Sequence, residues 1–331
     1  MLIDRVNIDT GDDCITPKTN VPDKTGKFVP LRNLTVRNSR LRSRSFGVKW
    51  GTETHGDMSD ILFDSIQIHN AHHGIGIDWR GASHLTNAVF SNINLLRMSW
   101  VGSGSYRHQN WMGAAQAISI TNKGNNGSYL LGPNETIGSV SHVRFENITS
   151  VTENSAVFVS TCTRTGNSTY DSHGLCTEGL PSTIHNIEFV NVVAVIEQLP
   201  SNNASNGPHP SHDDTTGMKP IDSRGTGLPV DAFFVEMATD VTFKDCSASF
   251  SGKSSVSQDC LLEDETCPNS FGQCLRFGPG FVGDRTQRLD SCVPPNAPDA
   301  PSGLSGRLSA LSILHSKSVF VWRVCMGAQV A

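Results

Sequence analysis

The sequence predicts an all-β protein built as a parallel β-helix, in which short strands stack along one axis. Three observations predict this fold class. A six-residue segment with the alternation of a strand recurs along the chain, a second strand-like segment recurs with the same spacing, and each copy of the first ends in a small polar residue. Apolar residues at the spacing of an amphipathic helix are missing from these segments.

The first segment carries apolar residues at its second and fourth positions, which is the period of a strand with one buried face. Its copies are NLTVRN from residue 33, DILFDS from 60, NAVFSN from 87, HVRFEN from 142, NIEFVN from 186 and DVTFKD from 240. The first three copies start 27 residues apart, and the later gaps of 55, 44 and 54 leave room for loops or an extra repeat. The final polar residues are Asn38, Ser65, Asn92, Asn147, Asn191 and Asp245. We expect their side chains to hydrogen-bond from one copy to the next.

The second segment keeps the same spacing. Its copies are FGVKW from residue 46, HGIGI from 73, QAISI from 116 and SAVFV from 155. Two short strands per repeat, at a period between 20 and 50 residues, are typical of a solenoid. An ordinary β-sandwich also has alternating strands, but it does not repeat polar turn positions in register.

The repeats place the β-helix over residues 1–250. A cysteine-rich loop region follows over 251–295, and a Pro-rich linker with a tail over 296–331. The nine cysteines lack a CxxC pair, so disulfides explain them better than zinc. Because their number is odd, we expect one thiol outside a disulfide, at Cys14 or Cys325.

Composition excludes several partners. With 17% charged residues and a net charge of −5, nothing indicates nucleic acid or an anionic membrane surface, and no apolar run is long enough to span a membrane. Six N-x-S/T sequons indicate secretion, and they start at Asn33, Asn126, Asn134, Asn147, Asn167 and Asn203. The first residues lack the regions of a signal peptide. A secreted protein without one indicates that the N-terminus is missing, so we expect an extracellular monomer whose N-terminal repeats are missing.

The stretch TGDDCI places Asp12 and Asp13 side by side after Gly11. Hydrolysis of a glycosidic bond needs one protonated carboxyl for the leaving oxygen and one ionised carboxyl to activate water. Neighbours in a strand point to opposite faces, so both side chains reach one face only if the backbone bends, which Gly11 makes easy. A solvated Gly-Asp-Asp turn is the other interpretation.

TGDDCI, LRNLTVRNSRLRSRSFGVKWGTE and MSDILFDSIQIHNAHHGIGIDWRG together resemble family 28 of the glycoside hydrolases, to which polygalacturonases and rhamnogalacturonan hydrolases belong. The resemblance covers roughly residues 3–200. It implies a right-handed, single-stranded parallel β-helix of the pectin-lyase-like kind, which cleaves pectin backbones with inversion. By this resemblance Asp12 is the general acid and Asp13 helps to activate water.

The chain departs from the family at three places. The family's third aspartate comes from an N-T-D phrase about one repeat before the pair, and the chain begins too late to contain it. Phe46 replaces the histidine of a Gly-His-Gly phrase. The Arg-Ile-Lys phrase that grips a galacturonate carboxylate aligns with GID, residues 76–78, so the arginine and lysine that a simple polygalacturonase needs are absent there.

Strand ends near the pair supply other candidates for contact with a polysaccharide. Because stacked strands lie about 4.8 Å apart, we expect Lys49 and Arg80 to contact an acidic or hydroxyl-rich sugar, with Glu53 orienting one of them. A surface ion pair between Lys49 and Glu53 is the plainer interpretation. Trp79 and Trp111 could stack on sugar rings, although a buried or rim tryptophan is commoner.

No cofactor and no metal site are predicted. HNAHHG, from His69, and HPSHDD, from His209, contain ligand types for a divalent metal, but the second reads better as a loop. Two rival functions stay open. One is a polysaccharide lyase on the same architecture, with a cation and a basic residue to remove a proton beside a uronate. The other is a noncatalytic β-helix that binds carbohydrate or serves as a structural protein.

Overall fold

The described part of the chain consists of β-strands and loops, and no helix occurs in it, so none of these residues forms a helix that could cross a bilayer. The structure is a computed structural model. It describes residues 1–20, 22–52, 54–79, 81–98, 115–122, 138–161, 183–197, 231–251, 275–278, 281–287 and 291–293. Glu53, Arg80, Trp111, the HPSHDD stretch, four of the six sequons and the tail from 296 lie outside these ranges.

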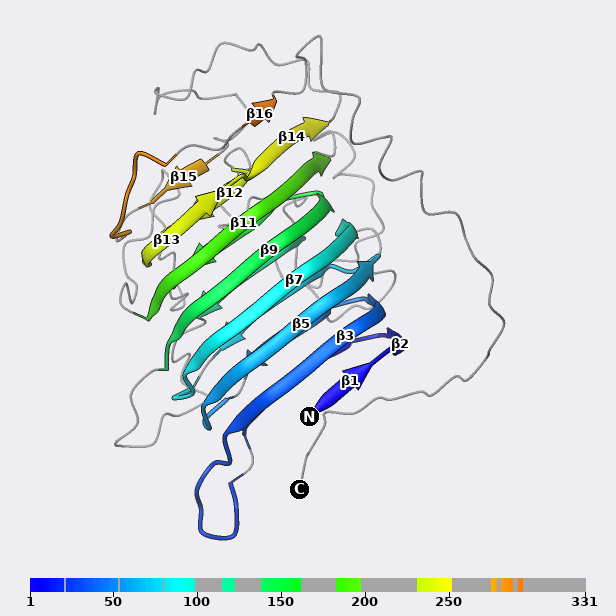
Figure 1. Cartoon of the computed structure of the whole chain (residues 1–331), viewed down its shortest axis with the longest axis vertical. Helices are drawn as coiled ribbons and strands as arrows, with labels where there is room; N and C mark the ends of the chain where they lie inside the picture. The colour runs from blue at the N-terminus through cyan, green and yellow to red at the C-terminus, as the bar shows by residue number, and fades with distance from the viewer. Residues whose placement is uncertain are drawn as a thin grey trace, which may run out of the picture.

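Among the described residues, the larger of two sheets has ten strands, and all pairings between them are parallel. Figure 1 shows its long strands side by side across the molecule. In spatial order they are β1 (Leu2–Asp4), β3 (Leu31–Ser43), β5 (Met58–His69), β7 (Leu85–Met98), β9 (Val140–Thr152), β11 (Ile184–Glu197), β14 (Ser247–Ser251) and β16 (Ser291–Val293). Two short strands complete it, β2 (Asn7–Thr10) beside β3 and β13 (Thr239–Lys244) beside β11.

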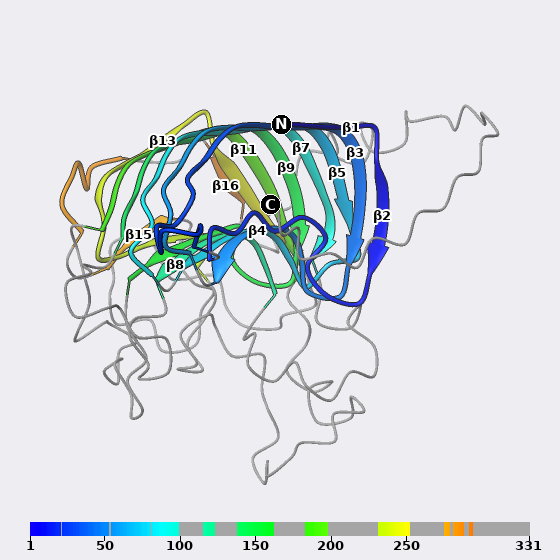
Figure 2. The ribbon, with the colours of Figure 1, turned by 90° about the horizontal axis from the view of Figure 1, so that it is seen from below.

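The smaller sheet has six strands within the described ranges, and they are also parallel. Its order is β15 (Leu275–Phe277), β12 (Phe233–Val235), β10 (Val157–Ser160), β8 (Gln116–Asn122), β6 (His73–Trp79) and β4 (Phe46–Thr52). From β3 to β12 the chain alternates between the two sheets, and each return adds a strand next to the previous one. In Figure 2, β4 and β8 of the smaller sheet lie below the larger sheet.

The observed register confirms the repeat that the sequence predicts. Leu31 pairs with Met58, and Met58 with Leu85, which is an offset of 27 residues each time. The second segment is aligned in the same way, because Phe46 pairs with His73 and His73 with Gln116. The prediction of an all-β chain with long stacked parallel strands is therefore confirmed.

Both end positions of the six-residue segment adopt a left-handed backbone, with φ between 51° and 58° in every copy. Asparagine and aspartate tolerate this conformation better than other residues with a side chain. In β3 the alternation of buried and exposed residues slips at Asn38, so the strand turns there while its apolar residues stay on the inner side. The polar residues therefore mark the places where long strands bend.

The predicted hydrogen bonds between final polar residues are present from the third to the fifth copy, and the third copy bonds to Asp64 of the second in place of Ser65. Asn191 donates its side-chain N–H to Asn147 Oδ1 at 2.9 Å, Asn147 donates to Asn92 Oδ1 at 3.2 Å, and Asn92 donates to Asp64 Oδ1 at 2.7 Å. We call these four residues the asparagine ladder. It satisfies the side-chain amides at the bends, where the backbone departs from the regular strand geometry.

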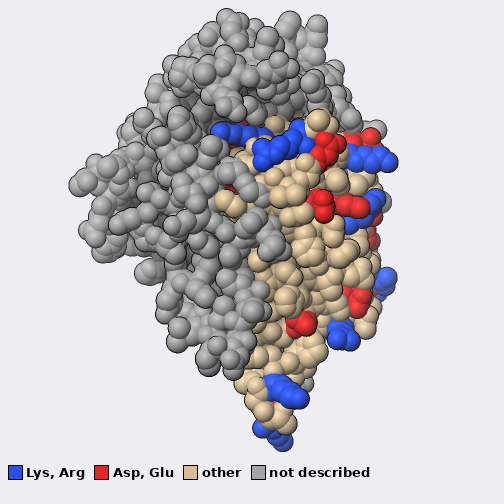
Figure 3. Space-filling view, turned by 90° about the vertical axis from the view of Figure 1, so that its left-hand side faces the viewer, with Lys and Arg blue, Asp and Glu red and all other residues tan. Residues whose placement is uncertain are grey.

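The core lies between the two sheets and is built from the inward positions of both. One column of it is a run of phenylalanines with neighbouring ring centroids 4.9–5.5 Å apart. Its members from the larger sheet are Phe63, Phe90, Phe145, Phe189 and Phe243. Burial of one such side chain contributes roughly 1.5–3 kcal/mol. Outside, Lys and Arg are interspersed with Asp and Glu on the face in Figure 3.

The cysteine prediction needs a correction. We expected one thiol outside a disulfide, at Cys14 or Cys325. Cys14 is such a thiol, but Cys246 is a thiol as well. The Cys246 side chain is buried in the core, where its Sγ lies 3.3 Å from the carbonyl oxygen of Lys244. It therefore behaves as a small apolar residue and does not join a disulfide. The side chains of the other seven cysteines lie outside the described set.

Candidate active site

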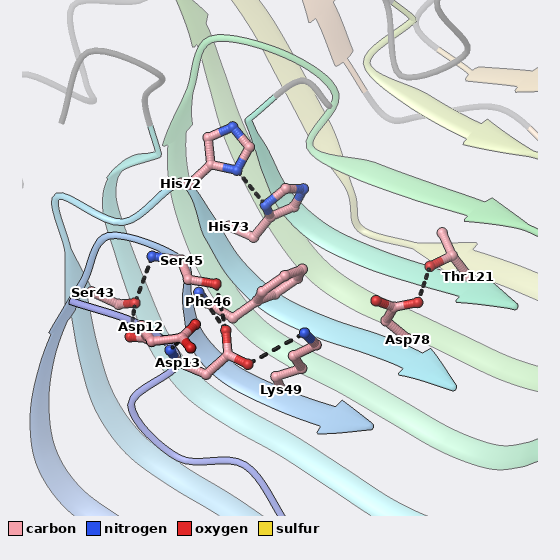
Figure 4. A network of polar contacts seen from close by, with 10 residues as sticks. All are labelled: Asp12, Asp13, Ser43, Ser45, Phe46, Lys49, His72, His73, Asp78 and Thr121. Carbon is pink, nitrogen blue, oxygen red and sulfur yellow. Dashed lines mark hydrogen bonds and ion pairs between the residues drawn. The ribbon is translucent and has the colours of Figure 1, made fainter. Parts of the chain in front are cut away.

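The adjacent aspartates lie at the edge of the smaller sheet. The chain leaves β2 and bends at Gly11 and Asp12, and then Ile15 pairs with Val48 of β4. Backbone N–H groups of Cys14 and Lys49 bond to the carbonyl oxygens of Phe46 (3.0 Å) and Ile15 (2.9 Å). The bend that the sequence analysis required is therefore present, and it brings the pair beside β4 (Figure 4).

Asp13 is surrounded by hydrogen-bond donors. Its Oδ1 accepts from the Ser45 hydroxyl and from the Phe46 N–H at 3.2 Å, and its Oδ2 lies 3.3 Å from Lys49 Nζ. An ionised carboxylate is acceptor-only and gains most from charge-assisted donors. These three donors therefore hold the Asp13 carboxyl in a fixed orientation.

Asp12 has a different environment. Its side chain is exposed, and its Oδ1 accepts the N–H of Asp13 at 2.9 Å. The backbone is fixed on both sides, since the N–H of Asp12 donates to Thr10 Oγ1 at 3.3 Å and its carbonyl accepts from Ser43 Oγ at 2.7 Å. The two neighbouring carboxyls thus differ, one open to solvent and one held by donors.

Lys49 lies where the sequence spacing predicts, next to the aspartates, but it is buried. Its side chain is only 4% exposed, against 15% for Asp13. The ammonium also lies over the ring of Phe46, 4.8 Å from its centroid. Figure 4 shows the Lys49 side chain directed toward Asp13.

A stack of rings supports this arrangement. The Phe46 ring stacks on His73 with centroids 4.4 Å apart, and His73 Nδ1 lies 2.7 Å from His72 Nδ1. Gly76, which follows on β6, leaves the space that the Phe46 ring fills. The Phe46 ring is therefore a packed part of the site.

Cys14, next to Asp13, is unsuited to nucleophilic chemistry. Burial, opposed by a hydrogen bond to the Arg42 carbonyl and reinforced by the charges of Asp13 and Asp9, raises the pKa of the Cys14 thiol to about 12. The thiolate is the reactive form of cysteine, so this thiol is inert at neutral pH.

A second polar row lies on the outer side of the smaller sheet. Thr121 Oγ1 donates to Asp78 Oδ1 at 3.4 Å, and Ser160 Oγ donates to Glu236 Oε1 at 2.7 Å. Register links the two pairs, because Thr121 of β8 aligns with Ser160 of β10. The two carboxyls are almost fully buried, at 1% and 0% exposure.

The remaining sequence candidates divide into two groups. Glu53, Arg80 and Trp111 lie outside the described residues. Trp79 is fully buried, and its indole N–H donates to the Gly138 carbonyl at 3.3 Å, so sugar stacking at Trp79 is wrong and the core position is confirmed.

The histidines of HNAHHG do not gather into a metal site. His69 accepts from Arg40 Nε at 2.9 Å, whereas His72 and His73 are buried together. Across the described ranges, no group of three or more His, Cys, Asp or Glu side chains could hold a metal ion.

Sequence reasoning missed Ser43, at the end of β3, and Ser45, in the loop before β4, which fix Asp12 and Asp13 respectively. The sequence contains a signal that could have found these two serines. Aligning CITP with the second repeated segment puts Ile15 opposite Val48, and this places Asp13 beside Ser45 and Phe46.

Comparison with known proteins gives no relative: no family model, no curated protein and no solved structure matches the chain.

Proposed function

We propose that this protein is a secreted glycoside hydrolase of the family 28 type. It hydrolyses a cell-wall polysaccharide of the pectin type on a right-handed, single-stranded parallel β-helix. The observation that carries the proposal is the asymmetry of the carboxyl pair, with Asp12 exposed and Asp13 held by the Ser45 hydroxyl, the Phe46 N–H and Lys49. The in-register stacking of parallel strands supports the solenoid.

The reaction follows from the two environments. Asp12, protonated, gives its proton to the glycosidic oxygen while the bond from that oxygen to the anomeric carbon breaks. A water on the opposite face attacks the anomeric carbon and loses its proton toward Asp13. Such inversion needs carboxyl groups about 6.5–9.5 Å apart, with the water between them. No cofactor takes part.

The substrate class is hydroxyl-rich and not restricted to galacturonate. Gly76 and Asp78 occupy the positions where a polygalacturonase grips a carboxylate with arginine and lysine. Glu53 and Arg80 remain proposed sugar contacts on the strength of their spacing alone. A polysaccharide of this kind is the expected partner, met by a monomer outside the cell.

The test is release of reducing ends from a pectin panel by the wild-type chain and by Asp12→Asn. We expect the substitution to lower the rate by about 10²–10⁴-fold, because it removes the proton donor and keeps the shape. Asp9→Asn, on β2, is the matched control, and we expect it to keep the wild-type rate. Unchanged release by Asp12→Asn would show that the acid assignment is wrong. Products that absorb in the ultraviolet would favour a lyase, since hydrolysis gives none.

A noncatalytic, carbohydrate-binding β-helix is the second candidate. It is favoured by Phe46, whose apolar ring fills the place of a histidine beside the pair. Binding to the same panel without release of reducing ends or unsaturated products would make it the better account.

A further inference from the structure

We propose that Lys49 is a positioning residue for Asp13 and not a contact for the sugar, an inference that rests on the proposed function. Lys49 Nζ lies 3.3 Å from Asp13 Oδ2, and its side chain is 4% exposed. A side chain that contacts the sugar has to present its polar end to the open face of the site. Here the ammonium head is directed at the carboxylate of its own chain.

The backbone holds the two residues in a fixed relation. The N–H of Lys49 bonds to the Ile15 carbonyl at 2.9 Å, and Ile15 is two residues after Asp13. The carboxylate and its cation are therefore carried by two segments that are hydrogen-bonded to each other. Thermal motion of either segment moves both groups together.

The ring below the ammonium restricts it further. Lys49 Nζ lies 4.8 Å from the centroid of Phe46, and Phe46 is stacked on His73 at 4.4 Å. Attraction between a cation and an aromatic face adds to the ion pair when water is excluded. With the Ser45 hydroxyl and the Phe46 N–H on Oδ1, Lys49 on Oδ2 completes the support of the Asp13 carboxylate.

The consequence is a division of labour between the aspartates. Lys49 keeps Asp13 oriented as the proton acceptor for water, and the exposed Asp12 is left as the donor. Removal of one partner from a buried ion pair leaves an uncompensated charge, so loss of Lys49 disturbs Asp13 directly.

The experiment separates positioning from binding by the kinetics of Lys49→Met. A positioned base contributes roughly 10²–10⁴-fold, so we expect kcat to fall at least about tenfold while KM stays within about twofold. Calorimetric titration of the substrate oligosaccharide into the Asp12→Asn protein, with and without Lys49→Met, should give similar Kd values. Arg42→Met, which removes the exposed Arg42–Asp9 ion pair, is the control and should leave kcat and KM unchanged.

Two further variants keep the test decisive. Lys49→Arg retains the charge and should recover part of kcat, and it replaces Lys49→Met if thermal melting shows that Lys49→Met does not fold. In an Asp13→Asn background, Lys49→Met should cost little additional kcat, since the group it acts through is gone.

The outcomes distinguish the two proposals. A tenfold rise in KM and Kd with kcat preserved would make Lys49 a sugar ligand and overturn the inference, while the hydrolase function stands. A wild-type chain that releases nothing from any polysaccharide overturns the proposed function and this role with it.

Discussion

Gly76 controls how the candidate site packs. It aligns with Lys49 across β4 and β6, and a Cβ added at this position would overlap the Phe46 ring. That ring lies between His73 and the Lys49 ammonium, so it has little room to give way. A side chain as small as a methyl group at residue 76 would thus displace the support of Asp13.

We expect Gly76→Ala to lower the free energy of unfolding by about 1–3 kcal/mol, the usual cost of an overpacked site. Urea denaturation measures it. Gly11→Ala is the matched control, because no atom lies within 4 Å of its added Cβ, and its effect should stay within about 0.5 kcal/mol. Equal effects from the two substitutions would contradict this account. In a Phe46→Ala background, the cost of Gly76→Ala should largely disappear.

At the residue scale, the sequence predicts which residues lie next to one another better than which side chains are exposed. The 27-residue spacing places Lys49 near the aspartates, because stacked strands bring equivalent positions together. The spacing says nothing about which side chains are covered. Lys49, expected to contact a sugar, is buried, whereas Trp79 takes the commoner of its two expected positions, in the core.

The asparagine ladder is the feature that links long strands to one another at their bends. Asn147 has φ of 54° and both donates to Asn92 and accepts from Asn191. Asn147 contributes to stability in two ways. Its backbone tolerates a left-handed conformation, and its side-chain amide forms hydrogen bonds. A pair of substitutions can separate them.

We expect Asn147→Ala to lower the free energy of unfolding by about 2–3 kcal/mol and Asn147→Gly by about 1 kcal/mol less. Both lose the amide bonds, worth roughly 0.5–1.5 kcal/mol each, but only alanine also pays the strain of a left-handed backbone, roughly 1–2 kcal/mol. Chemical denaturation of the two variants gives the difference. If alanine and glycine cost the same, the backbone conformation at this bend contributes nothing.

At the element scale, the prediction succeeds where the repeat is regular. The spacing between successive copies of the first segment determines which residues of neighbouring strands pair. All six copies lie in the larger sheet. The last strands could not be predicted in this way. β15 and β16 are three residues long and carry no copy of either segment, although they extend the two sheets beyond residue 251. Their pairing depends on the sheet edges that earlier strands offer.

At the scale of the whole molecule, three aspartates along the larger sheet contribute to the response to acid. Hydrogen bonds from Asn38 and Asn87 hold the pKa values of Asp4 and Asp60, respectively, below the ordinary value of 3.8. For Asp64, burial raises the pKa, but hydrogen bonds from Ser91, Asn92 and Ser65 together outweigh it and keep the pKa below 3.8. In all three the folded protein favours the carboxylate.

We therefore expect stability to be maintained above about pH 4 and to fall as the medium becomes more acidic. A carboxyl whose pKa is lower in the folded than in the unfolded chain binds protons first in the unfolded state, so its contribution is complete above the unfolded value and is lost as the pH drops through the folded value. Melting temperatures between pH 2 and pH 7 measure this. Asp64→Asn sharpens the test, because the amide resembles a protonated carboxyl. The variant should be less stable than the wild type at pH 7, and the difference should shrink toward pH 2. A difference that stays constant across this range would mean that the charge of Asp64 does not stabilise the stack, and that the acid response originates elsewhere in the chain.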